Sequence, residues 1–183
     1  MSAPAPRRFS PVRLAWQRLF RGCDGLLAPW RPLDDRPAEV LLPPSGLTLY
    51  RRLGKADRAH SLRLLSWLRE HGHTDPALLS AAPLHDCGKA AAPLAVWQRT
   101  LKVLLKLFAP ALWRRLSRPA RPGHWRHPFF VLQTHPEIGA AWAEAAGLDP
   151  TVVWLIRFHE TDPNPADPHY LLMCALQQAD AAS

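Results

Sequence analysis

The sequence contains the stretch Leu84-His85-Asp86-Cys87-Gly88-Lys89, which places an imidazole and a carboxylate side by side just before a glycine. Imidazole nitrogens and carboxylate oxygens are the groups that hold divalent ions such as Mn, Fe, Co, Ni, Zn or Mg. Gly88 permits a sharp turn, so that both side chains can reach one ion. Two more groups of these kinds lie far away along the chain. The predicted metal ligands are therefore His60, His85, Asp86 and Asp180.

The composition indicates one globular domain. A chain of 183 residues with 48% hydrophobic residues can bury a substantial core. Its three cysteines are widely separated and form no CxxC pair, which excludes a disulfide framework or a thiolate zinc site and favours a reducing, cytoplasmic setting. No secretory signal or membrane-spanning stretch is expected. We predict an N-terminal Pro/Arg-rich segment over residues 1–46 and a domain over residues 47–183.

The charge is distributed unevenly along the chain. The formal net charge is +8, and residues 94–127 hold eight basic and no acidic residues. Residues 128–183 hold one basic residue against seven acidic ones. This pattern favours a partner that carries phosphate groups.

Apolar spacing predicts helices almost throughout, hence an all-α fold. One helix is expected over about Leu47 to Glu70, and a second from Pro76 to His85, with Thr74 or Asp75 as its cap and an early end or kink at Pro83. Residues 94–113 form a basic amphipathic helix that Pro110 bends or breaks. Residues 117–128 form a loop. Three further helices are expected: one after His135-Pro136 that runs to Ala146, one from Asp149-Pro150 to His159-Glu160, and one from His169 onward.

These motifs resemble the HD-domain metal-dependent phosphohydrolases over about residues 47–183. The resemblance rests on five stretches: Arg58-Ala59-His60-Ser61-Leu62, His85-Asp86-Cys87-Gly88-Lys89, His135-Pro136-Glu137-Ile138-Gly139, His159-Glu160 and Ala179-Asp180. It implies a helical bundle with one metal held by His60, His85, Asp86 and Asp180. In the phosphodiesterase branch of the family, a second metal is bridged by the Asp of the doublet, and His135 and His159 match that branch's additional histidines.

The resemblance also implies the chemistry. Asp86 and Lys89 are the predicted catalytic residues, with Lys89 on the scissile phosphate. The predicted activity is hydrolysis of a nucleotide or related phosphate ester by a metal-activated water. Two departures separate this chain from the cyclic-dinucleotide branch. Phe158-His159 stands where that branch has two histidines, and Asp162-Pro163-Asn164-Pro165 replaces its Gly-Tyr-Pro motif.

Several alternatives remain open at this level. The second class of function is a non-catalytic module that senses a nucleotide or docks on an anionic surface, either lipid or nucleic acid. His135 could cap a helix, His159 could be a surface residue, and Asp180 could be a helix-terminal carboxylate near a frayed end. The basic helix in 94–127 either covers the core or contacts a membrane surface peripherally, with nucleic acid as a less favoured partner.

Overall fold

The structure is a computed structural model that describes residues 32–183. Residues 1–31 of the Pro/Arg-rich segment predicted over residues 1–46 lie outside the described residues. Within residues 32–183 the fold is all-α, as predicted, and contains no strand. The α-helices are α2 (Arg36–Leu41), α3 (Pro44–Arg51), α4 (Lys55–Glu70), α5 (Pro76–Leu84), α6 (Val96–Phe108), α7 (Pro110–Leu116), α8 (His127–Ala145), α9 (Pro150–Phe158) and α10 (Tyr170–Ala182), and a 3₁₀ helix, η2 (Cys87–Ala91), follows α5.

Several predicted boundaries are confirmed. α5 begins at Pro76, and the Asp75 carboxylate accepts a hydrogen bond from the backbone N–H of Leu78. α9 begins at Pro150 in the same way, with Asp149 as its cap. Pro110 separates α6 from α7, because proline lacks the N–H that would continue a helix.

Two predicted boundaries are wrong. The single helix expected over residues 47–70 is two helices, α3 and α4, divided at Leu53-Gly54. Gly54 has extended backbone and caps α4, whereas Leu53 is buried, so the apolar pattern continues across the break. The helix expected to begin after His135-Pro136 begins at His127 and contains Pro136 in its interior.

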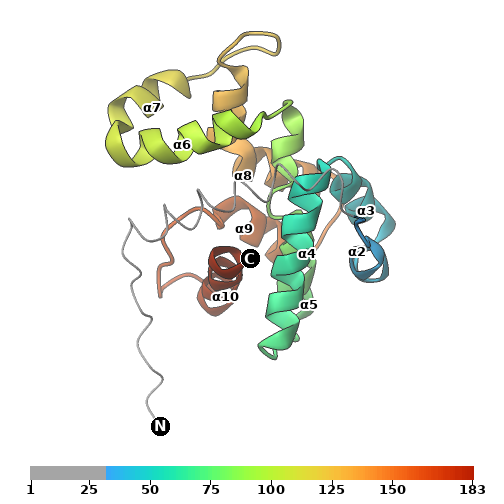
Figure 1. The fold of residues 1–183 in the computed structure, drawn as a ribbon. Helices are drawn as coiled ribbons and strands as arrows, with labels where there is room; N and C mark the ends of the chain where they lie inside the picture. Colours follow the sequence, from blue (N-terminus) through green and yellow to red (C-terminus); the bar gives the residue numbers. More distant parts are fainter. Residues whose placement is uncertain (1–31) are drawn as a thin grey trace.

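The main core is built from α2 to α5, the second half of α8, α9 and α10. Ala38 and Leu42 of α2 and its C-terminal cap belong to this core, although they precede the predicted domain start at residue 47. A second, smaller core forms where α6 and α7 meet the start of α8, around Trp113, Phe129 and Leu132. Figure 1 shows α6 and α7 side by side at one end of the molecule, away from α2 and α3.

Candidate metal centre

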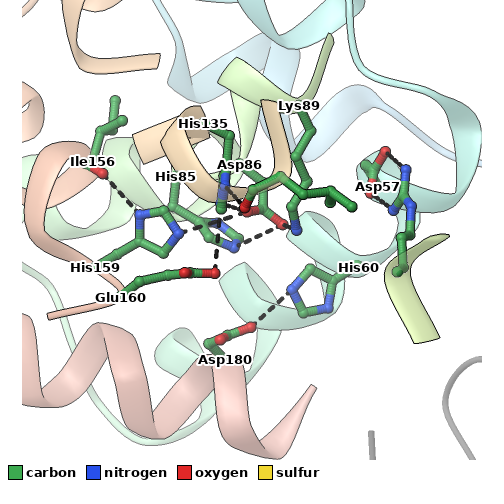
Figure 2. A network of polar contacts seen from close by, with 12 residues as sticks. Asp57, His60, His85, Asp86, Lys89, His135, Ile156, His159, Glu160 and Asp180 are labelled. Atoms are coloured by element: carbon green, nitrogen blue, oxygen red, sulfur yellow. Dashed lines mark hydrogen bonds and ion pairs between the residues drawn. The ribbon is translucent and has the colours of Figure 1, made fainter. Parts of the chain in front are cut away.

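The six predicted metal ligands, contributed by five segments, gather in one place (Figure 2). His60 comes from α4, His135 from α8 and Asp180 from α10. The other three, His85, Asp86 and His159, follow the C-terminal ends of α5 and α9. His85, Asp86, His135 and His159 are buried. The interpretations of His135 as a helix cap and of His159 as a surface residue are therefore wrong. Asp180 lies in the last turn of α10 and contacts His60.

Asp86 lies at the centre of the cluster. Its Oδ1 is 3.1 Å from Nε2 of His135 and 3.6 Å from Nε2 of His159. Its Oδ2 is 3.4 Å from Nε2 of His85 and 2.5 Å from Nζ of Lys89. Burial raises the pKa of Asp86, but the charges of Lys89 and His85 and the histidine contacts outweigh burial and hold it well below its usual range. Asp86 is therefore an ionised carboxylate with polar neighbours on both oxygens.

The donor atoms form two groups of three. His60, His85 and Asp180 make one group, and Asp86, His135 and His159 make the other, with all donor atoms of a group within 4.8 Å of one another. In the first group, Nε2 of His60 is 3.0 Å from Oδ1 of Asp180. Contact with His60 lowers the pKa of Asp180 despite its burial. Each group contains imidazole nitrogen and carboxylate oxygen, a mixture that suits a divalent transition metal or Mg.

The same type of side-chain-to-backbone hydrogen bond orients three histidines. Nδ1 of His85, His135 and His159 lies 2.9, 3.1 and 2.8 Å from the carbonyl oxygen three residues earlier. A carbonyl only accepts, so in each ring Nδ1 carries the hydrogen and Nε2 points into the cluster. α5 and α9 end beside their histidines, which leaves the last carbonyls free for this bond. In α8, Pro136 has no N–H for the carbonyl of Leu132, and His135 donates to that carbonyl instead.

His135 provides the clearest test of whether these residues fit a metal ion. It is fully buried, and burial lowers its pKa to about 4, so the ring is neutral near pH 7. With the hydrogen on Nδ1, Nε2 presents only a lone pair, and it has no hydrogen-bond partner although Oδ1 of Asp86 is 3.1 Å away. A lone pair facing a carboxylate in a buried site is unfavourable. A cation between the two atoms removes this conflict, so the residues present fit a metal.

His85 is in a different electrostatic state. Burial alone lowers its pKa, but the carboxylates of Asp86 and Asp180 outweigh burial and raise it to about 9. The ring is therefore protonated near pH 7 in the metal-free protein. This proton occupies the position where a divalent ion would bind Nε2.

Two glycines bring the motifs of η2 and α8 into contact. A Cβ on Gly88 would lie 2.0 Å from the carbonyl oxygen of His135 and 2.7 Å from the backbone nitrogen of Gly139. A Cβ on Gly139 would lie 3.0 Å from Sγ of Cys87. The absence of side chains at both positions lets the two backbones touch, and this contact places Asp86 beside His135.

Cys87 is buried, and Asp86 is its neighbour in the chain. Burial raises the pKa of the Cys87 thiol to about 12, and the Asp86 charge adds to this effect. Near pH 7 the thiol is protonated and therefore a poor nucleophile.

The basic helix α6 lies over this site. Lys102 Nζ is 2.6 Å and Lys106 Nζ is 3.2 Å from the carboxylate of Glu160, which is itself 3.8 Å from Nε2 of His135. Arg99 forms a two-pronged ion pair with the buried carboxylate of Asp57. The sequence interpretation assigned no role to Glu160 or Asp57. No local signal identified them, because Asp57 and Glu160 lie 42 and 58 residues from Arg99 and Lys102 along the chain.

A scan against protein-family models, a search of curated proteins and a search of solved structures each found no match to this chain.

Proposed function

We propose that this chain is a metal-dependent phosphohydrolase or phosphodiesterase of the HD type that hydrolyses a nucleotide or related phosphate ester. The observation that carries the proposal is the contact between Nε2 of His135 and Oδ1 of Asp86, two buried lone-pair donors that need a cation between them. The order of the motifs along the chain supports the same assignment.

In this proposal, different residues bind metal, stabilise charge on the phosphate and attract the substrate. The two donor groups would each hold a divalent ion, and Asp86, a member of one group, also contacts His85 of the other. The neighbours of Asp86 keep its carboxylate ionised. A bound ion supplies a water of lowered pKa as the nucleophile and offsets charge on the phosphate. Lys89 Nζ is 2.5 Å from Asp86. It is therefore within reach of an oxygen of a phosphate bound beside Asp86, and it stabilises the negative charge that develops on that phosphate. Lys102 and Lys106 add a positive field that attracts an anionic substrate.

The departures from the phosphodiesterase branch keep the substrate class broad. Phe158 packs against the main core and is no ligand. The residues that replace the Gly-Tyr-Pro motif form a loop between α9 and α10. We therefore propose phosphate-ester hydrolysis in general and do not assign a cyclic dinucleotide as substrate.

The test is turnover of a generic phosphodiester and of a nucleotide panel by protein that has been stripped with chelator and reloaded with Mn or Co. Asp86→Ala should lose activity by at least about 100-fold, because both donor groups are disturbed. Glu137→Ala is the matched control, since Glu137 is an exposed carboxylate on α8 two residues after His135. Its turnover should equal that of the native protein. Turnover by the native protein no higher than that of Asp86→Ala would refute the proposal.

A further inference from the structure

Helix α6 is unusual because its charged face forms ion pairs with carboxylates beside the candidate metal centre. Arg99, Lys102 and Lys106, spaced by three and four residues, pair with Asp57 and Glu160 at the candidate metal centre. A second face packs Leu101 and Leu105 on the small core beside α8. The third face is left for solvent.

That third face is apolar. Trp97, Leu104 and Phe108 are spaced by seven and four residues on one side of α6, and each is exposed, Phe108 to 76%. Leu107 of α6, Leu112 of α7 and Trp125 of the following loop extend the exposed apolar area. Val96, at the start of α6, is also exposed. Among residues 32–183 the other exposed large apolar side chains are Val40 and Leu171. We call the area formed by Trp97, Leu104, Leu107, Phe108, Leu112 and Trp125 the α6–α7 surface.

Arginines border the α6–α7 surface without acidic partners. Arg114, Arg115, Arg118 and Arg121 are exposed, and none of them has a carboxylate within ion-pair distance in the described part of the chain. Arg115, Arg118 and Arg126 line a groove of about 470 Å³ together with Leu112, Leu116 and Trp125. The groove therefore offers positive charge and apolar contact together.

We infer that the α6–α7 surface docks peripherally on an anionic lipid bilayer. Tryptophan, phenylalanine and leucine that enter the headgroup region, with arginines at the border, are the combination that interfacial helices use. The arginines complement anionic headgroups, and the groove takes a lipid phosphate beside its acyl chain. Nucleic acid fits less well, because Leu104, Leu107 and Leu112 have no counterpart on a phosphate backbone. No helix of residues 32–183 is long and apolar enough to cross a membrane.

The test is co-sedimentation of the full chain with phosphatidylcholine vesicles, with and without phosphatidylglycerol. Binding should require phosphatidylglycerol and weaken with salt. Phe108→Asp and the double variant Arg114→Glu/Arg115→Glu should each weaken binding by about tenfold or more. Val40→Asp is the matched control, because Val40 is an equally exposed apolar residue on α2, and it should bind like the native chain. Circular dichroism checks that each variant is folded.

Three results would overturn the inference. One is no vesicle binding, or equal binding by Phe108→Asp and the native chain. Another is a dimer in light scattering that Phe108→Asp dissociates, with no vesicle binding, which would assign the surface to a second copy of the chain. The third is tighter binding to duplex DNA than to vesicles, lost in the arginine variant but kept in Phe108→Asp.

Discussion

At the scale of the single residue, the charge state of each group follows from what faces it. His85 and His135 are both buried, yet the pKa of one is raised to about 9 and that of the other is lowered to about 4. His85 faces two carboxylates, Asp86 and Asp180, whereas burial and the nearby Lys89 dominate at His135. The same residue type therefore holds a proton at one position and a lone pair at the other. A metal could therefore bind Nε2 of His135 without displacing a proton, whereas it would have to displace one from Nε2 of His85.

Lys102 gives a pH prediction at this scale. Burial lowers its pKa from 10.5 to about 8, although Glu160 opposes the shift. Between these values the unfolded chain holds a proton that the folded chain has released, so this group makes the protein more stable as pH rises from 8 to 10.5. Relative to Lys102→Met, the free energy of unfolding of the native protein should rise by about 2 to 3 kcal/mol over that window.

Denaturant unfolding at several pH values measures this difference. Lys106→Met is the control, because Lys106 shares the partner Glu160 but its side chain is 42% exposed against 12% for Lys102. A difference between the native protein and Lys102→Met that stays constant from pH 8 to 10.5 would contradict the prediction.

At the scale of the element, the contact between η2 and α8 positions the centre. Gly88→Ala should destabilise the protein by about 2 kcal/mol or more, because a Cβ at 2.0 Å from the His135 carbonyl oxygen forces the two backbones apart. Gly54→Ala is the control, since a Cβ there would have no atom closer than 3.7 Å and Gly54 has a backbone conformation that alanine adopts. Thermal unfolding compares the two variants. Equal melting temperatures would show that the close approach does not matter.

Helix ends were predicted where a capping side chain or a proline decides them. Asp75-Pro76, Asp149-Pro150 and Pro110 act within their own turn, so their effect can be predicted from sequence. The prediction of a helix start at Pro136 was wrong; it followed from the preference of proline for the first position of a helix and its rarity in helix interiors. Here the side chain of His135 uses the carbonyl that Pro136 leaves free, and α8 continues. That compensation depends on the site itself.

At the scale of the whole molecule, the sequence indicated which residues could form a metal centre but not their environment. The six predicted ligands could be selected because their residue types and motifs are recognisable, and the structure brings them together. The inward direction of the basic face of α6 was not predicted, because its partners Asp57 and Glu160 lie 42 and 58 residues away from Arg99 and Lys102. The amphipathic pattern alone is satisfied by either face against the core. Contacts with residues far away along the chain determine that the basic face of α6 turns inward. The same packing leaves apolar residues of α6 exposed to solvent.

The central claim is that the cluster around Asp86 holds a divalent metal, and elemental analysis of the protein tests it most directly. The native chain, incubated with Mn or Zn and then desalted, should retain at least about one ion per chain. Glu137→Ala should retain the same amount, and Asp86→Ala should lose most of it. A native chain that retains no divalent metal, or an Asp86→Ala chain that retains as much as the native one, would contradict the account.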